Sequence, residues 1–427
     1  MSKIKIALSC PIDTYSGYGA RSRDIVKALL KTEKYDIEIL SQRWGNTRFG
    51  YLKDHGEDLL YSLIVPGLSQ KPDVWFQITI PNEFQPVGKY NIGVTAGIET
   101  NLCHHEWIEG GNRMDLILAS SEHTKQVLVD TVYELEQNSQ NVGTIKLKTP
   151  VEVLFEGVDL EKYFPTTLDE SSTVKQTLDS IEESFAFLFV GHWLQGDFNQ
   201  DRKNVGLLIK AFLEVFKNKK KAPALILKTQ HANSSILDRD QILKKINSIR
   251  NTVKGKLPNI YLIHGELADE EVNELYSHTK VKAMINLTKG EGFGRPLLEF
   301  SVHNKPIIAS NWSGQTDFLH KDYTFLVDGE LENVHKSAAV KNMLLTEAKW
   351  FTASSSHAGI GMREVFEKYK EYQEKAKRQG YHARTNFSWE AMADKLDNIL
   401  TERLPEFPKQ VPFSLPKLEL PKLQKLG

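Results

Sequence analysis

Cysteine, net charge and long apolar runs are all scarce in this sequence of 427 residues. The two cysteines, Cys10 and Cys103, are too few for a disulfide framework and fit a reducing compartment, so we expect a cytoplasmic protein. The 54 basic and 55 acidic residues leave a net charge of −1, which excludes nucleic-acid binding by bulk positive charge but not by a local basic patch. No apolar run approaches the ~18 residues of a membrane span, and Lys3–Ile6 alternates charged and apolar residues like a first strand, not a signal peptide.

What the sequence does contain is a regular alternation of short apolar runs with amphipathic stretches. Its hydrophobic fraction of 40% and charged fraction of 26% are ordinary for a globular protein. Strands that alternate with helices favour parallel sheets covered by helices on both faces, so we predict an α/β fold. The expected strands are 4–9, 35–40, 74–80, 90–96, 116–120 and 151–155 in the first half, and 186–191, 224–228, 260–265, 283–287, 306–310 and 324–327 in the second.

The length predicts two domains with an appended tail, at ~100–200 residues per domain. The stretch 166–184 is polar and acidic and lacks a strand pattern, so it is interpreted as a surface linker. It separates a first domain, 1–165, from a second domain, 185–370. We expect the terminal helices, 371–400, to cross back to the first domain.

The end of the chain contains two expected helices and a proline-rich tail. The first helix, 361–379, is strongly charged and Gly380 is its predicted C-cap, whereas Ser388 is the predicted N-cap of the second helix. Five prolines in 401–427 exclude a helix there, and an extended or polyproline segment is expected. This tail either packs on the body, reaches a protein partner or stays solvated.

The segment 288–299 (TKGEGFGRPLLE) follows an expected strand and begins an expected helix. Its glycines allow close approach of a ligand, and Pro296 suits the first turn of a helix. Free N–H groups at such a turn bind phosphate. Glu291 precedes the turn, and Glu299 lies about one turn into the helix, where it can accept hydrogen bonds from a sugar diol. The alternative is a tight strand–helix turn with a carboxylate near the helix start.

These residues form a Glu-x7-Glu element, EGFGRPLLE, and the chain resembles the GT-B glycosyltransferases of family 4 from about residue 1 to 400. Several other segments carry the same resemblance. They are FVGHW at 189–193, RKNV at 202–205, HGEL at 264–267, SGQTD at 313–317, VLFEGVD at 153–159 with Phe164-Pro165, and FSW at 387–389.

The resemblance implies two Rossmann-like, doubly wound parallel-sheet domains that face each other across a cleft. The first domain, 1–165, is then expected to bind the acceptor, and the second, 185–370, the nucleotide sugar. It also implies retaining transfer of a sugar from a nucleotide-diphosphate sugar to a hydroxyl acceptor. Fixed cations can replace a divalent metal, so no metal ion and no further cofactor are expected. In this family the matching positions bind the donor: Arg202 and Lys203 neutralise the diphosphate, the amides of Gly292, Phe293 and Gly294 cap it, Glu299 binds the ribose, Glu291 faces the donor sugar, and Gly191 and His264 line the nucleotide site.

The chain departs from the family pattern at two positions. His192 stands where the family has an arginine, so Arg202 or Arg295 is expected to compensate at the phosphates. Arg295 itself replaces an apolar residue of the family. It is either a surface arginine at a helix start or a contact to donor or acceptor.

Two further candidates lie in the first domain. Gly17 and Gly19 follow the first strand, but Ser22 replaces the third glycine of a dinucleotide fingerprint, so the motif alone is weak. In the family this loop lines the cleft beside the distal phosphate and the acceptor. Glu99 follows the expected strand 90–96, where ligands of such folds bind. It either caps the strand end, binds sugar hydroxyls or acts as a catalytic base toward the acceptor.

Two acidic or histidine-containing triplets are rejected as metal sites. His104-His105-Glu106 does not form an HExxH motif, and Asp238-Arg239-Asp240 opens a helical stretch, where acidic residues are favoured anyway.

Other functions remain open on this sequence. A nucleotide-sugar epimerase or phosphorylase would use the same fold, and a non-catalytic scaffold would dock partners through the Pro-Lys-Leu repeats of the tail. The acceptor is equally open, as a glycan, lipid, protein or modified nucleic-acid base.

Overall fold

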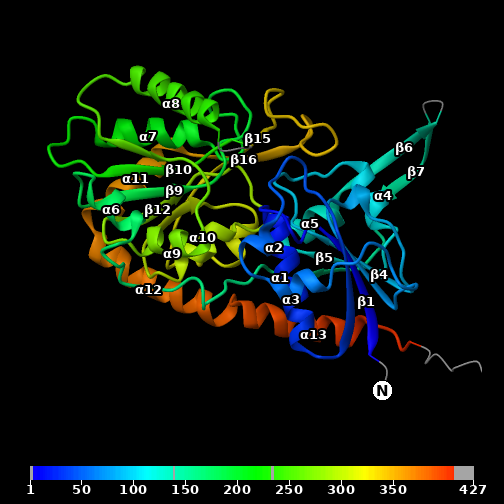
Figure 1. Ribbon diagram of the computed structural model, residues 1–427. Helices are drawn as coiled ribbons and strands as arrows, with labels where there is room; N and C mark the ends of the chain where they lie inside the picture. Colours follow the sequence, from blue (N-terminus) through cyan, green and yellow to red (C-terminus); the bar gives the residue numbers. More distant parts are fainter. Residues whose placement is uncertain (1–2, 138–139, 232–234, 408–427) are drawn as a thin grey trace, which may run out of the picture.

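The computed structural model describes residues 3–137, 140–231 and 235–407, and its main feature is a pair of six-stranded sheets (Figure 1). Their strand orders are β2-β1-β3-β4-β5-β8 and β11-β10-β9-β12-β13-β14, and neighbouring strands in both run parallel. The first sheet contains β1 (Ile4–Cys10), β2 (Tyr35–Ser41), β3 (Val74–Ile78), β4 (Tyr90–Thr95), β5 (Leu116–Ala119) and β8 (Val151–Val153). The second contains β9 (Ala186–Val190), β10 (Ala224–Lys228), β11 (Ile260–Ile263), β12 (Val281–Asn286), β13 (Ile307–Ser310) and β14 (Phe325–Val327).

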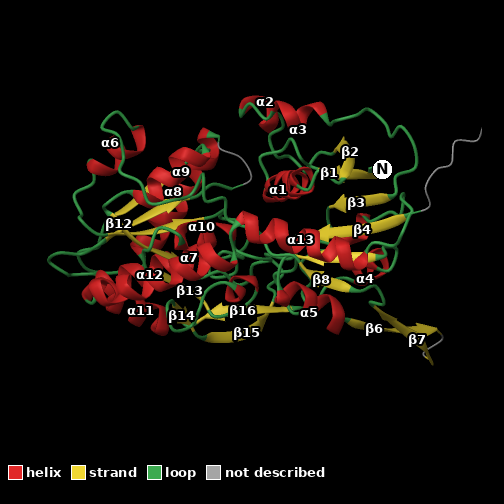
Figure 2. Cartoon of the chain, turned by 90° about the horizontal axis from the view of Figure 1, so that it is seen from below, coloured by secondary structure: helices red, strands yellow, loops and turns green. Residues whose placement is uncertain are grey.

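Each of these twelve strands overlaps an expected one, although most differ from their expected bounds by one or two residues, so the α/β prediction is confirmed. Parallel neighbours need a crossover connection, and helices supply most of these connections. Figure 2 shows helices on both sides of each sheet. The helices are α1 (Gly17–Lys31), α2 (Tyr51–Asp54), α3 (Asp58–Ser62), α4 (His105–Gly111), α5 (Glu122–Asp130), α6 (Thr173–Asp179), α7 (Val205–Phe216), α8 (Ile236–Asn251), α9 (Asp269–Ser277), α10 (Arg295–Ser301), α11 (Ser355–Glu367), α12 (Tyr369–Asn386) and α13 (Trp389–Arg403), with 3-10 turns at Pro81–Glu83 and Gly314–Asp317.

Two antiparallel hairpins outside the sheets were not predicted. They are β6 (Val132–Gln137) with β7 (Gln140–Lys146), and β15 (Gly329–Asn333) with β16 (Lys349–Ala353). The first projects from its domain in both views (Figures 1 and 2). β15 has the sequence GELEN and is mostly exposed, so it has no apolar run by which a strand is recognised.

The expected linker at 166–184 contains the short helix α6. Ser172 caps this helix, and its hydroxyl also donates to Glu274 of α9 at 2.7 Å. Val174 and Leu178 are buried in the core that joins the two domains. Because polar residues dominate the stretch 166–184, the sequence pattern did not predict that Val174 and Leu178 are buried.

The terminal helices differ from their predicted bounds. Gly380 lies inside α12 and does not cap a helix, because α11 ends at Glu367 and α12 continues to Asn386. Ser388 caps α13 as predicted, and Trp389 Nε1 donates to Asp24 O of α1 at 3.3 Å. α13 continues three residues into the expected tail, to Arg403, and the chain becomes extended at Leu404 because Pro405 follows. Residues 408–427 of the predicted tail lie outside the described residues.

Gly380 is required by close packing, and we expect Gly380→Ala to destabilise the protein. A Cβ there would lie 2.3 Å from Asn304 Oδ1 and 2.9 Å from Ser301 O. Alanine gains about 1 kcal/mol of helix propensity, but the clash costs roughly 1–3 kcal/mol, so the net free energy of unfolding should fall in denaturant melts. Gly17→Ala is the matched control, because a Cβ there meets nothing within 4 Å. Equal stability of both variants would contradict this account.

One hydrophobic core joins the domains. It runs from residues of the first sheet, such as Leu8 and Phe76, through α13 to Leu298 and Phe300 of α10 in the second domain. A second core fills the far side of the second domain, around Phe187 and Phe212. None of the helices in the described parts of the chain has the length and apolarity that crossing a membrane requires.

Candidate active site between the two domains

A cavity of about 610 Å³ lies between the two domains. The loop before α1 and α1 itself line it on one side, with Gly17 and Asp24 among their residues. The turn after β9, which includes Gly191, and the start of α10 line it on the other. Both linings come from the carboxyl ends of parallel strands and the helices that follow, where ligands bind in open α/β sheets.

The glycine turn that begins α10 packs directly on the first domain. Gly292 lies so close to β4 that a Cβ on it would be 2.0 Å from Ala96 O, and the Ser120 hydroxyl lies 3.0 Å from Gly292 O. Gly294 has φ +104° and precedes the helix, and Pro296 occupies its first turn as predicted. Within the described chain, the amides of Gly292, Phe293 and Gly294 have no hydrogen-bond acceptor.

Glu291 sits at the centre of a buried charge cluster. Its carboxylate contacts Lys203 Nζ, and its Oε2 lies 3.3 Å from Arg202 Nη1. The same Arg202 nitrogen lies 3.5 Å from Glu99 Oε1, which brings the first domain into the cluster. Burial raises the pKa of Glu291, but the two cations outweigh it and the pKa is lowered, so the carboxylate is ionised. Burial lowers the pKa of Lys203.

The structure thus brings together four of the predicted site residues, from segments far apart in sequence. Lys203 also approaches Gly191, since its Cε lies 3.5 Å from the place of a Cβ there. A side chain at position 191 would therefore contact Lys203. Because this position is glycine, the ammonium group of Lys203 lies close to a residue that lines the cleft.

A second ionic group links the domains at the other end of the α10 turn. Arg295 Nη1 lies 2.7 Å from Asp24 Oδ2 of α1, and Arg295 Nε lies 3.0 Å from Glu299 Oε1. Burial raises the pKa of Glu299 to about 7, against the opposing effect of Arg295. Arg295 is therefore not a solvated surface residue, because two carboxylates hold it, and it lines the cavity. His192 also lines the cavity, with its Nδ1 2.8 Å from His231 O.

Of the predicted set, Gly17, Gly191, Arg295 and Glu299 line the cleft cavity. Its lining does not include Glu99, Arg202, Lys203, Glu291 or the 292–294 turn. Two further predicted residues also lie away from it. His264 Nε2 lies 2.7 Å from Asp238 Oδ2, and His264 does not line the cleft cavity. Gly19 packs against Thr14, where a Cβ would lie 2.3 Å from Thr14 O, whereas Gly17 lines the cavity.

Sequence reasoning missed several residues that line the cleft. Thr229 and Gln230 follow β10, and among the described residues their buried side-chain oxygens Oγ1 and Oε1 have no hydrogen-bond partner. Their position after the carboxyl end of a parallel strand was the signal that could have identified them. Lys162 and Asp269 form an ion pair of 2.8 Å at the rim. No motif in the sequence marks Asp24 as a site residue, because its partner, Arg295, lies 271 residues further along the chain.

The rejected metal triplets have other roles. His104 caps α4, and His105 Nδ1 lies 3.4 Å from Glu109. Asp238 lies in the first turn of α8, and its carboxylate is hydrogen-bonded to the rings of His231 and His264. Over the described residues, no group of three or more His, Cys, Asp or Glu side chains is arranged to hold a metal ion.

Comparison with known proteins finds structural similarity without sequence similarity. No family model and no curated protein matches the chain. The structure is similar to a glycosyltransferase from Rickettsia africae at 14% identity, covering 95% of this chain and 99% of that one with a TM-score of 0.64. It is similar to a sucrose-phosphate synthase from Thermosynechococcus elongatus at 12% identity, covering 94% and 99% with a TM-score of 0.62. A third similar structure is HepE from Anabaena in complex with UDP-glucose, at 13% identity, covering 93% and 100% with a TM-score of 0.61.

At these identities the likeness shows the fold. The chain has the GT-B arrangement of two Rossmann-like, doubly wound domains, as predicted.

Proposed function

We propose that this protein is a retaining glycosyltransferase that moves a sugar from a nucleotide-diphosphate sugar to a hydroxyl acceptor. The observation that carries the proposal is the buried cluster of Lys203, Arg202 and Glu291, whose carboxylate belongs to the turn that leads to Glu299, a residue that lines the cleft. Similar structures support the same proposal, since HepE forms a complex with UDP-glucose and a structurally similar Escherichia coli protein is bound to UDP-2-fluoro glucose.

Each residue group has a physical task in such a reaction. The leaving diphosphate gains negative charge as its bond to the sugar breaks, and preorganised cations such as Lys203 stabilise that charge. Glu291 holds these cations in place and faces the electron-poor sugar, where its negative charge is favourable. Glu299 accepts hydrogen bonds from the ribose. The acceptor oxygen forms the new bond to the sugar as the bond to the diphosphate breaks, and its proton passes to the leaving phosphate. Because fixed cations such as Lys203 supply the positive charge that stabilises the diphosphate, we expect the step to need no metal ion.

A donor screen tests this function. UDP-glucose, UDP-galactose, UDP-N-acetylglucosamine, GDP-mannose and ADP-glucose are each incubated with the protein, with and without a crude acceptor extract, and nucleotide release is measured. Release with at least one donor, together with NMR detection of the retained anomer, is the expected result. Conversion of the sugar without an acceptor would indicate an epimerase, and a requirement for phosphate would indicate a phosphorylase. No release with any donor would contradict the proposal.

Affinity for UDP should rise between about pH 6 and pH 8, because Glu299 loses its proton near pH 7 and the carboxylate is the better acceptor for ribose hydroxyls. The pH dependence of folding stability has the opposite sign to that of the UDP affinity. The folded-state pKa is raised from 4.5, so the contribution of Glu299 to stability is present below pH 4.5 and is lost as the pH rises through about 7. Titration calorimetry across this range measures the affinity. Glu299→Gln should remove this part of the rise, and an identical pH profile in the variant would contradict the assignment.

A further inference from the structure

Four ion pairs connect the first domain to the second within the described residues. They are Arg295–Asp24, Arg202–Glu99, Lys162–Asp269 and Arg48–Glu266. The pair of Arg295 is mostly buried, with side chains that are 20% and 13% exposed. The pair of Arg48 is the most exposed of the four, with side chains that are 56% and 41% exposed. Because water and salt screen an exposed ion pair, the domains separate most easily at Arg48.

Arg48 is fixed within the first domain by contacts of its own. Its Nη2 lies 2.6 Å from Asp54 Oδ2, and its guanidinium group lies over the ring of Tyr15, 4.6 Å from the ring centroid. Its backbone oxygen also accepts a hydrogen bond from Tyr15 N at 3.1 Å. Since Tyr15 lines the cleft cavity, these contacts hold the arginine at the rim of that cavity without help from the second domain.

Glu266 lies on the opposite wall, in the loop that follows β11. It lines the cleft cavity, and its Oε2 lies 3.2 Å from Arg48 Nη1. Lys228 Nζ donates to Gly265 O at 2.6 Å, which ties this loop to the end of β10. Among the described residues, Arg48 is the one ion-pair partner of Glu266. The pair therefore spans the mouth of the cavity from one domain to the other.

A second, weaker contact crosses the mouth beside this pair. It comes from Tyr51 at the start of α2, a helix at the edge of the first domain next to the second (Figure 1). The ring of Tyr51 packs against Arg23 and His55, at 3.4 and 3.9 Å. Its hydroxyl lies 3.4 Å from Asp269 Oδ2, a long and weak hydrogen bond. Tyr51 alone therefore adds little to the closure of the mouth.

We propose that Arg48 and Glu266 form a latch at the mouth of the cleft cavity, and that this latch sets the rates at which a nucleotide enters and leaves. The nucleotide part of this inference rests on the proposed function. When the ion pair breaks, the mouth opens at Arg48, while the mostly buried pair of Arg295 keeps the domains joined. Arg48 does not line the cavity, so its loss changes the passage of the ligand and not the contacts of the bound ligand.

Distances between spin labels in the ligand-free protein test the latch directly. Both native cysteines are buried, so the labels attach to introduced cysteines. Asn46→Cys places one label on the exposed loop before Arg48, and Glu270→Cys places the other at an exposed position beside Asp269. The distance between these labels, measured by double electron–electron resonance, should broaden toward longer values when Arg48→Met is added.

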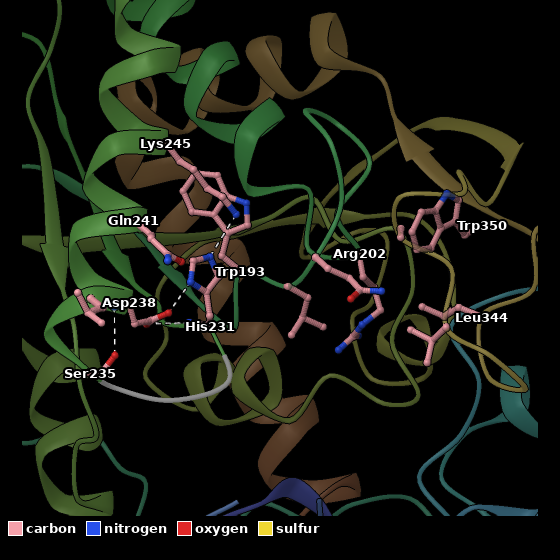
Figure 3. Close-up of a pocket in the computed structure, with 14 residues that line it drawn as sticks. Trp193, Arg202, His231, Ser235, Asp238, Gln241, Lys245, Leu344 and Trp350 are labelled. Carbon is pink, nitrogen blue, oxygen red and sulfur yellow. Dashed lines mark hydrogen bonds and ion pairs between the residues drawn. The ribbon is translucent and has the colours of Figure 1, made fainter. Parts of the chain in front are cut away.

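A separate cavity of the second domain provides the reference distance. It has a volume of about 630 Å³ and is lined by residues of the second domain alone, with Lys245 on one side and Leu344 on the other (Figure 3). Labels on Lys244→Cys and Lys341→Cys, both at exposed positions, flank this cavity. Because both labels lie within one domain, the distance between them should not change in Arg48→Met.

Nucleotide kinetics test the second part of the proposal, with stopped-flow measurements on UDP that carries a fluorescent group. Arg48→Met should raise kon and koff together by about 2- to 5-fold and keep the Kd within about twofold, the effect of losing an exposed ion pair. Glu266→Gln should raise both rates alike, although it leaves the pair of Arg48 and Asp54 intact. Arg43→Met is the matched control. Arg43 is an exposed arginine of the same loop and has no ion pair in the described chain, so both rates should stay unchanged.

Unchanged label distances or unchanged nucleotide rates in Arg48→Met would overturn the proposal, and so would an equal effect of Arg43→Met. A rise in koff with kon unchanged would also overturn it, because Arg48 would then be a ligand contact. If UDP binds and the latch variants behave like the unmodified protein, only the latch fails. If the label distance lengthens and no nucleotide or nucleotide sugar binds, the glycosyltransferase proposal fails and the latch between the domains remains.

Discussion

Lys203→Met is expected to lower kcat/KM for the nucleotide-sugar donor by about 10²–10³-fold, the usual effect of removing one preorganised charge-stabilising group. Lys203 is nearly buried, and its ammonium group contacts Glu291. Among the described residues, Glu291 in the variant keeps Arg202 as its one cationic partner, at 3.3 Å, so a bound diphosphate would meet a site with one positive charge fewer. Nucleotide release from the donor identified by the screen measures the effect.

Two further variants make this result interpretable. Lys203→Arg keeps the charge and should recover part of the activity, although a planar guanidinium group does not reproduce the geometry of an ammonium group. Lys220→Met removes an exposed lysine that follows α7 and should leave the rate unchanged. If Lys203→Met is folded and keeps the donor rate within about twofold, Lys203 is not a diphosphate ligand and a non-catalytic role gains support.

The sheets could be predicted from the sequence because buried parallel strands are short, nearly continuous apolar runs. Ala224–Lys228, for example, agrees with its predicted bounds. The β15–β16 hairpin could not be predicted, since its buried contacts come from Trp350 and the apolar cluster around it and not from an alternating pattern in β15. Gly380 was misassigned for a related reason. A glycine near the end of a charged helical stretch is typical of a C-cap, whereas here it makes room for Asn304 of another segment.

The candidate site likewise has residues that the sequence reveals and residues that it does not. Glu291 and Glu299 belong to one contiguous motif that its glycines and spacing single out, whereas Lys203 was assigned through the resemblance of 202–205 to a glycosyltransferase segment. The partners of these residues could not be found in either way, because they depend on which faces of α1, α8 and α10 meet. Asp24 carries no motif, yet it holds Arg295. His264 matched a family segment, yet Asp238, 26 residues earlier, holds its ring.

Arg295→Met is expected to lower the free energy of unfolding by about 3 kcal/mol and to weaken the contact between the domains. Removing one partner of a buried ionic group costs about 3–5 kcal/mol because the remaining carboxylates stay buried without compensation. We expect the lower end, since 20% of the Arg295 side chain is exposed. The loss also removes the effect that lowers the pKa of Glu299, so the midpoint of the pH-dependent rise in UDP affinity should move above its value near 7.

A double-mutant cycle distinguishes this ionic link from a general packing defect. Asp24→Asn alone leaves Arg295 paired with Glu299, whereas Arg295→Met removes both contacts, so the two substitutions should be strongly non-additive. Arg378→Met, at an exposed position of α12, is the matched control and should change the free energy of unfolding by less than about 0.5 kcal/mol. Additive effects in the cycle, or an unchanged pH midpoint in Arg295→Met, would show that Arg295 does not couple α1 to the Glu299 carboxylate. Non-additivity together with the alkaline shift would mean that the arginine which departs from the family pattern links domain contact to nucleotide binding.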